Sequence, residues 1–495
     1  MTARAASRAS LASVALALIA GCAVGPNFRT PVPPIPASLA PPASEGAAAA
    51  SAAPVPDRWW DGFGDAQLSR LIAEAAAANL DVRDATIRVT EARAQARIAD
   101  ADQWPSIGGG ASYQRQRLSE RTAEGRLLTG LPGLPNPADQ YQLGFDASWE
   151  VDLFGRVRRE VEAAGADTQA AVEARHDALV TLEGDVARDY IEARSLQAQL
   201  SVTEANLATQ REVLQFTSDR ERSGLGVGLD TANAAAQVAA TEGQIPTLRA
   251  QLSARINALS FLLAREPRAV AAELAAAQAV PAGPATPAVG LPADLVRRRP
   301  DIRAAEARLH AATARQGVAV ADLFPKLTLA ASFGVQSQHP GDLTSWASRF
   351  LQAGPSLEIP IFEGGRRVAT MDLRRAETQE TATAYARTVL AAFHDVDDAL
   401  TAYGDELRRH AALGEAVAQS RDALQLARLR YADGVTDFLS VLDAERNLQA
   451  NEGALAVSTG QVSTDEVALY KALGGGWDLP ELATAGSAAD RQARR

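Results

Sequence analysis

The stretch Leu429-Arg-Tyr-Ala-Asp-Gly-Val-Thr-Asp-Phe-Leu-Ser-Val-Leu-Asp-Ala-Glu-Arg446 decides the fold, because a degenerate copy of it lies 210 positions upstream. In that copy Arg222-Ser-Gly224 matches Ala432-Asp-Gly434, and Leu229 matches Leu439. A glycine at the same place in both segments is typical of a sharp backbone reversal that needs positive φ. The stretch therefore predicts a helical hairpin that occurs twice.

A second matching pair of segments shows that the duplication extends beyond the hairpin. Asp81-Val-Arg83, upstream of Trp104-Pro105, matches Asp301-Ile-Arg303 upstream of Phe324-Pro325, at an offset of 220. The chain is therefore a duplicated unit. We expect each copy to contain a long helix, two strands, a very long helix, a glycine turn and a further helix.

The composition narrows the classes of function. The chain has 495 residues, of which 47% are hydrophobic but only 5% aromatic, which suits closely packed helices better than a thick globular core. A net charge of −11 argues against nucleic-acid binding, which needs a basic surface. The acidic balance is consistent with a passage that tolerates cations, although a solvated surface is the commoner explanation.

The N-terminus has the pattern of a secretory signal. Arg4 and Arg8 precede a short apolar run, 11–20, which is too short to stay as a membrane-spanning helix. Cys22 follows and is the only cysteine, so it cannot form an internal disulfide. We interpret residues 1–21 as a signal peptide and Cys22 as the lipid-accepting residue of a bacterial lipoprotein; the alternative is a chance cysteine. Residues 22–56, rich in Pro, Ala and Ser, are expected to be a lipidated tether.

Seven-residue repeats predict long supercoiled helices. Two segments, 156–222 and 366–432, each read as one helix of 67 residues, or roughly 100 Å at about 1.5 Å per residue. The first repeat series comprises Val389, Val396, Tyr403, His410, Val417, Leu424 and Tyr431, and the second Val441, Leu448, Leu455, Val462 and Leu469.

Alternating apolar and polar residues predict four strands, at about 106–117, 140–152, 326–337 and 350–361. Their lengths are near the roughly ten residues that a tilted strand needs to cross a bilayer. A half-wet sheet in a soluble protein is the alternative, and the lipoprotein signal favours the membrane. Because four strands cannot close a barrel and an open edge is not tolerated in lipid, several chains must pool their strands.

Four motifs resemble those of the TolC-like outer-membrane factors of tripartite efflux systems, specifically the NodT-type lipoprotein subgroup. They are Ser148-Trp-Glu-Val-Asp-Leu-Phe-Gly-Arg156, Leu295-Val-Arg-Arg-Arg-Pro-Asp-Ile-Arg303, Phe438-Leu-Ser-Val-Leu-Asp-Ala-Glu-Arg446 and Leu469-Tyr-Lys-Ala-Leu-Gly-Gly-Gly-Trp477. The resemblance covers about residues 57–477. It implies an α+β fold, in which a long coiled-coil α-helical barrel continues into a transmembrane β-barrel completed by trimerisation, with four strands from each chain.

The resemblance also implies a function and an organisation. The expected function is a passive, gated outer-membrane channel of an RND-type tripartite pump, in a homotrimer whose helical part lies in the periplasm. Its partners would be a periplasmic adaptor, an inner-membrane pump and outer-membrane lipid. We expect the first repeat at 57–266, a connector at 267–292, the second repeat at 293–477 and a tail at 478–495. The alternatives are a type I-like secretion component and a lipid-anchored coiled-coil scaffold without a channel.

The family closes its tunnel near the hairpin turn of the second repeat, by charged and tyrosine side chains. The matching positions are Tyr431, Asp443 and Arg446, with Asp230 as a weaker candidate in the first repeat. Asp443 and Arg446 are three residues apart and share a helix face, so an ordinary intrahelical ion pair is the alternative reading. Ser440 and Thr436 stand where some members have charged residues.

The two hairpin tips resemble the segments by which family members meet the adaptor. Their glycines are at minimum turn-formers, and contact with the adaptor is what the resemblance adds. The positions concerned are Gly224, Gly228, Leu229, Gly434, Val435 and Asp437.

No group of residues resembles a catalytic or metal site, and we expect neither an enzyme nor a cofactor. The five histidines show no metal-ligand spacing with cysteine or paired carboxylates. They are His176, His310, His339, His394 and His410.

Overall fold

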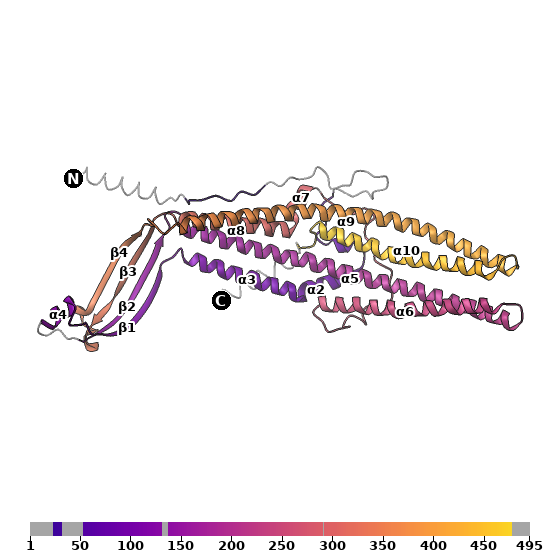
Figure 1. The fold of residues 1–495 in the computed structure, drawn as a ribbon, viewed down its shortest axis with the longest axis horizontal. Coiled ribbons are helices and arrows are strands. Elements are labelled where there is room, and N and C mark those ends of the chain that lie inside the picture. Colours follow the sequence, from indigo (N-terminus) through magenta and orange to yellow (C-terminus); the bar gives the residue numbers. More distant parts are fainter. Residues whose placement is uncertain (1–22, 32–52, 131–136, 291, 478–495) are drawn as a thin grey trace. The chain divides into compact units, whose positions relative to one another are not determined.

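The computed structural model describes residues 23–31, 53–130, 137–290 and 292–477. Figure 1 shows the elements in chain order, and each copy has a pair of strands preceded by a helix and followed by a very long helix and a further helix, as the duplication predicts. The strands are β1 (Ser106–Gln116), β2 (Ala138–Val151), β3 (Lys326–Ser337) and β4 (Arg349–Glu358). The helices are η1 (Trp59–Phe63), α2 (Ala66–Ala78), α3 (Leu80–Ala101), α4 (Ala123–Gly130), α5 (Arg156–Arg222), α6 (Gly228–Leu262), α7 (Pro292–Arg298), α8 (Pro300–Ala321), η2 (Pro340–Asp342), η3 (Trp346–Ser348), α9 (Arg366–Ala432) and α10 (Phe438–Ala472).

The two longest helices have the bounds that the sequence predicts. Helices α5 and α9 each contain 67 residues, and the helices that follow them, α6 and α10, each contain 35. Two elements differ from the expectation. Strand β4 ends at Glu358 instead of near 361, close to Pro360, which has no N–H for the strand ladder. The loop between the first two strands contains α4, which alternation and turn signals did not indicate.

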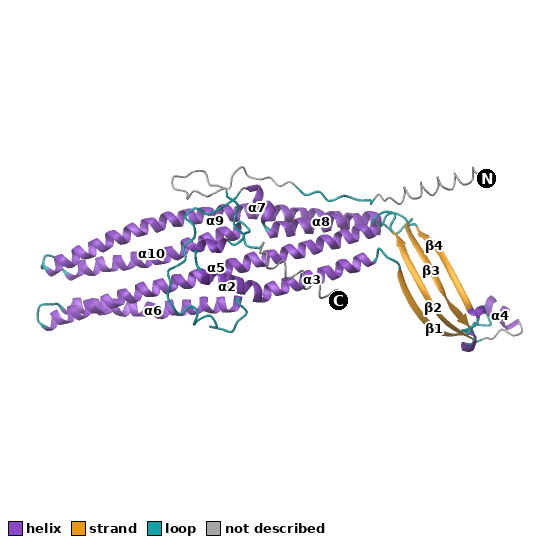
Figure 2. Cartoon of the chain, turned by 180° about the vertical axis from the view of Figure 1, so that it is seen from behind, coloured by secondary structure: helices purple, strands orange, loops and turns teal. Residues whose placement is uncertain are grey.

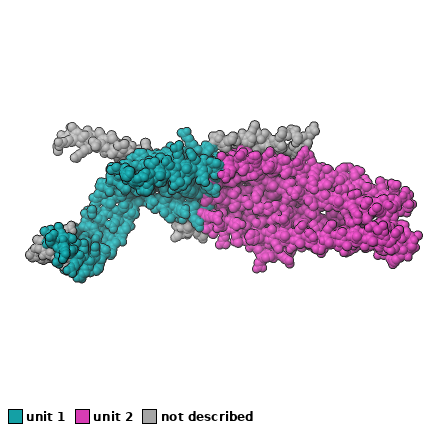
Figure 3. Space-filling view, viewed as in Figure 1, with its two compact units in different colours: residues 1–31, 89–170, 305–385 teal, residues 32–88, 171–304, 386–495 magenta. Residues whose placement is uncertain are grey.

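The chain forms two compact units, and each takes segments from both repeats. Unit 1 comprises residues 1–31, 89–170 and 305–385, and unit 2 comprises residues 32–88, 171–304 and 386–495 (Figure 3). No helix within the described residues has both the length and the apolar character needed to cross a bilayer.

Unit 1 contains a four-stranded antiparallel sheet in the order β1-β2-β3-β4. Phe145 on β2 lies opposite Phe333 on β3, and Phe333 lies opposite Leu351 on β4. All three side chains are exposed in the single chain. One face of the sheet is thus an uncovered apolar surface, which a water-facing sheet would not maintain.

Unit 2 confirms the seven-residue pattern. The five apolar members of the first series that precede Tyr431 are buried, and His410 is half-buried with its Nε2 3.1 Å from Thr459 Oγ1 on α10. Figure 2 shows α9 beside α10 and α5 beside α6. Polar pairs such as Asn451–Ser420 (2.8 Å) join α10 to α9 across the seam. The period therefore sets which side of α9 faces its neighbours.

Two of the four sequence motifs meet in unit 2. Trp477 Nε1 donates to the Arg298 carbonyl at 3.1 Å, and the Arg303 guanidinium lies 5.0 Å from the Trp477 ring centroid. Gly476 has φ of 110°, and a Cβ added there would lie 1.8 Å from Glu183 Oε2. The glycines before Trp477 therefore let the chain pass close to α5, which their spacing in the sequence does not reveal.

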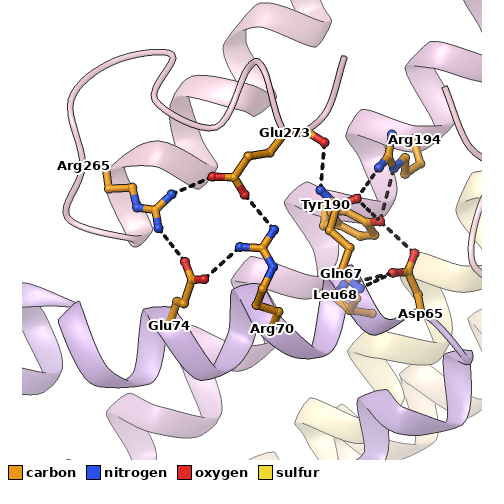
Figure 4. Close-up of polar contacts among 9 residues, drawn as sticks. All are labelled: Asp65, Gln67, Leu68, Arg70, Glu74, Tyr190, Arg194, Arg265 and Glu273. Atoms are coloured by element: carbon orange, nitrogen blue, oxygen red, sulfur yellow. Dashed lines mark hydrogen bonds and ion pairs between the residues drawn. The ribbon is translucent and has the colours of Figure 1, made fainter. Parts of the chain in front are cut away.

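A polar network fixes α2 against α5 and the segment after α6 (Figure 4). Arg70 and Arg265 alternate with Glu74 and Glu273 in a closed ring of ion pairs 2.6–3.0 Å long. Beside this ring, the Tyr190 hydroxyl donates to Asp65 at 2.7 Å, and burial raises the pKa of Tyr190 to about 12. The start of the expected connector is therefore packed onto the helices.

We predict that Glu466→Gln stabilises the protein at neutral and higher pH. Glu466 on α10 is 1% exposed, and burial raises its pKa from 4.5 to about 8. Its charged form is disfavoured in the folded state, so the wild type loses stability as the pH rises from about 4.5 to 8. At pH 7 the free energy of unfolding of the variant should be roughly 3 kcal/mol higher.

Thermal unfolding in detergent should show a higher unfolding temperature for the variant at pH 8 and no difference at pH 4.5. The exposed Glu212→Gln serves as control, and an equal shift at both pH values would contradict the prediction.

Candidate gate and hairpin tips

Both helical hairpins of unit 2 end in the same backbone turn. Gly224 has φ of 72° and Gly434 has φ of 71°. In the first tip the Leu225 N–H donates to the Arg220 carbonyl at 2.9 Å, and in the second the Val435 N–H donates to the Arg430 carbonyl at 2.9 Å. This pattern of a left-handed glycine and a six-residue hydrogen-bonded loop closes a helix C-terminus. The duplicated glycines are therefore turn-formers in both repeats.

The helix that leaves each tip begins differently. Asp437 caps α10, since its Oδ1 accepts from the Ser440 hydroxyl at 2.8 Å and from the Ser440 N–H at 3.1 Å. These hydrogen bonds hold the pKa of Asp437 below its usual range. Thr436 donates to the Ser440 hydroxyl at 2.9 Å, so Thr436 and Ser440 complete the cap. In the first tip, Val227 occupies the capping position of α6, and its side chain accepts no hydrogen bond.

Apolar side chains are exposed at both tips. Leu225 is 73% exposed, and Val227 and Leu229 are also exposed. In the second tip Val435 and Leu439 are exposed. Gly228 is the first residue of α6 and lies between these side chains in sequence. The tips thus present apolar surface that the described residues do not cover.

Asp443 and Arg446 lie on α10 and both are exposed. Across the described part of the chain they form no ion pair with each other, so the intrahelical pair is not observed. Instead, Arg446 Nε donates to Gln237 Oε1 on α6 at 3.1 Å, and Gln237 Nε2 donates to Gln449 at 3.1 Å. Asp443 forms no ion pair with any described residue.

Tyr431 contacts both hairpins. Its ring centroid lies 6.5 Å from that of Phe216 on α5 and 5.7 Å from that of Phe438 on α10. The Arg220 guanidinium lies 5.1 Å from the Tyr431 ring. Tyr431 therefore packs the two hairpins together. Asp230 is half-exposed in the first turn of α6, and among the described residues it forms no hydrogen bond or ion pair with the other gate candidates.

Glu445 is a residue that the sequence analysis missed. It is 3% exposed, lines a groove of about 480 Å³ between α5, α9 and α10, and its Oε1 has no hydrogen-bond partner among the described residues. Burial raises the pKa of Glu445, and the Arg428 charge opposes this. The available signal was its spacing, four residues after Val441 and three before Leu448, which places a carboxylate on the packed side of α10.

The remaining candidates from the sequence are the lipidation site and the histidines. Cys22 lies outside the described residues. Where side chains are described, no group of His, Cys, Asp and Glu could hold a metal ion. His176 stacks on Trp477 with ring centroids 4.7 Å apart, and His310 stacks on Phe28 at 4.4 Å.

Known proteins share this architecture. A family model described as "Outer membrane efflux protein" matches residues 71–265 and 291–475. The chain is 36% identical over 453 residues to the pyoverdine export outer membrane protein OpmQ of Pseudomonas putida, covering 90% of this chain and 94% of the relative. It is 31% identical over 477 residues to nodulation protein T of Rhizobium leguminosarum bv. viciae, covering 96% and 94%. The solved outer-membrane channel OprN matches with a TM-score of 0.85 at 33% identity, over 92% of this chain and 100% of that one.

We predict that Tyr431→Ala loosens the contact between the two hairpins, while Tyr431→Phe does not. The alanine variant loses the aromatic contacts and the stacking with Arg220, which together should cost about 1–2 kcal/mol. Hydrogen exchange of amides at residues 216–225 and 428–438 should then be about tenfold faster. Equal exchange in the two variants would show that Tyr431 does not hold the hairpins together.

Proposed function

The chain belongs to the outer membrane efflux protein family, and from this premise we propose that it is the outer-membrane channel of a tripartite efflux pump. It provides a passive exit duct for small molecules. The observation that carries this function is the apolar, exposed face of a four-stranded sheet in a chain that also has long coiled-coil helices. A coiled-coil scaffold without a channel would instead have its sheet in water. The relatives are outer-membrane components of efflux systems, not enzymes.

Assembly as a homotrimer is supported by the sheet edges. Strands β1 and β4 are the two ends of the sheet, and each has an edge that no other described strand pairs with. In lipid, unpaired backbone N–H and C=O groups cost several kcal/mol each, so the edges of neighbouring chains pair and close a barrel. The proposed organisation has a signal peptide at 1–21, a lipid on Cys22, and repeats at 57–266 and 293–477.

The hairpin tips are the proposed contact with a periplasmic adaptor, which would join the channel to an RND-type inner-membrane pump. The support is the uncovered apolar surface at Leu225, Leu229 and Val435, held on two turns of fixed shape. Gly224, Gly228 and Gly434 would act by shaping this surface. Asp437 would act through its cap on α10.

The proposed gate consists of Asp443 and Arg446 from neighbouring chains, with Tyr431 of the second repeat and Asp230 of the first repeat as further candidates. Both charges are exposed in the single chain, and Asp443 has no ion-pair partner within its described residues. A contact between protomers at a narrow ring would be partly dehydrated, so it would be stronger than an ordinary surface pair. Adaptor binding would offset these contacts by favouring the open arrangement.

The purified protein should be a trimer that conducts ions across a planar bilayer. Native mass measurement in mild detergent should give three chains for each particle, because only pooled strands leave no open edge. Unheated samples should migrate differently from boiled ones in a detergent gel. A stable monomer, or a trimer without conductance, would refute the proposed channel.

Replacing Asp443 and Arg446 together by alanine should bias the channel toward the open state. We expect larger single-channel conductance and, in cells, greater sensitivity to large antibiotics that otherwise cannot enter. The matched control replaces Glu204 and Arg249, an exposed pair 2.9 Å apart between α5 and α6, by alanine. Unchanged conductance in the Asp443 and Arg446 variant, with the trimer intact, would place the seal elsewhere.

A further inference from the structure

A cavity of about 270 Å³ lies at the foot of the sheet in unit 1. It is lined where β2 leads into α5, where α8 leads into β3, and where β4 leads into α9. In a membrane-spanning sheet this is the end where strands give way to helices. The cavity is therefore at the level where a bilayer's acyl chains meet its polar surface.

The polar lining of the cavity is balanced in charge. Four acidic and four basic side chains contribute to it. Glu150 accepts from Arg156 Nε and Nη2, both at 2.8 Å, and lies 2.9 Å from Lys326 Nζ. Such a lining donates hydrogen bonds without a net positive field. It suits a neutral acceptor, such as a carboxylic ester, better than an anionic phosphate headgroup.

The cavity also has an apolar side. Phe154 and Phe324 both line it and stack with ring centroids 4.8 Å apart. Pro360 is a further lining residue, and the two residues after it, Ile361 and Phe362, are 91% and 86% exposed. Polar donors thus lie next to an uncovered apolar rim, an arrangement that matches a lipid at the membrane surface.

The described N-terminal segment begins beside this cavity. The Val24 N–H donates to the Phe154 carbonyl at 3.0 Å. Gly155 has φ of 84°, and a Cβ added to it would lie 2.7 Å from the Ala23 Cβ. Ala23 is the first described residue, and Cys22 directly precedes it in the sequence.

We propose that the cavity binds the glyceryl diester of the lipid carried by Cys22. The thioether-linked glyceryl group and its ester carbonyls enter the cavity and accept hydrogen bonds from Lys326 and Arg156. The acyl chains leave over the rim at Ile361 and Phe362. This inference rests on the proposed lipidation of Cys22, and it makes the lipid a fixed part of the protein at the base of the barrel.

A photoreactive side chain in the cavity tests this. Thr370 lines the cavity from the first turns of α9 and is exposed, so Thr370→benzoylphenylalanine should fold. Thr383→benzoylphenylalanine is the matched control: Thr383 is also exposed on α9 and, like Thr370, donates to the carbonyl four residues earlier. Each variant is made as the full chain, with Cys22 and with Cys22→Ser, and is irradiated in native membranes. Intact mass first establishes whether Cys22 bears the lipid.

The expected result is an adduct between residue 370 and the N-terminal lipopeptide, which is absent at residue 383 and lost in Cys22→Ser. A lipid on Cys22 without any such adduct at residue 370 would overturn the proposal. Equal adducts with free phospholipid in the Cys22 and Cys22→Ser chains would also overturn it, because the cavity would then take membrane lipid. An unmodified Cys22 would instead refute the lipid anchor itself.

Discussion

The unpaired edges of β1 and β4 constrain everything else in this molecule. A sheet with one apolar face and two open edges is stable neither in water nor in lipid as a single copy. Closure by neighbouring chains removes both problems at once, because it pairs the backbone and leaves the apolar face to the acyl chains. Each pair of strands is followed by two long helices from its own repeat. The duplication therefore gives every pair of strands the same number of long helices.

The seven-residue period determines which residues of the long helices in unit 2 are buried. Val396 and Leu424 are buried at the contact between helices, while Leu426 and Leu429 on the same helix α9 remain exposed. Only one side of α9 therefore has its apolar side chains buried by other described residues. Small side chains let the helices approach closely: a Cβ added to Gly460 on α10 would lie 2.5 Å from the Ser195 Cβ on α5.

Local patterns predicted most of the fold, since helix period, strand alternation and glycine turns are properties of neighbouring residues. The bounds of α5 and α9 follow from them directly. Contacts between distant segments were not predictable. The approach of Gly476 to Glu183, the stacking of Trp477 on His176, and the burial of Glu445 depend on residues from other helices. At the gate, sequence indicated Tyr431 but not Arg220, because a cation beside an aromatic ring has no signature in one dimension. The domain boundaries and the role of each gate residue stay predictions.

The identical turns at Gly224 and Gly434 have a consequence for symmetry. A ring of three chains presents six reversals with almost the same backbone, since the two φ values differ by only 1° (72° and 71°). The side chains, by contrast, repeat three times, because only the second turn has the Asp437 cap. A ligand that recognises backbone shape would find six equivalent binding sites on this ring. A ligand that recognises side chains would find three. The number of copies bound at the ring therefore reports which of the two features is recognised.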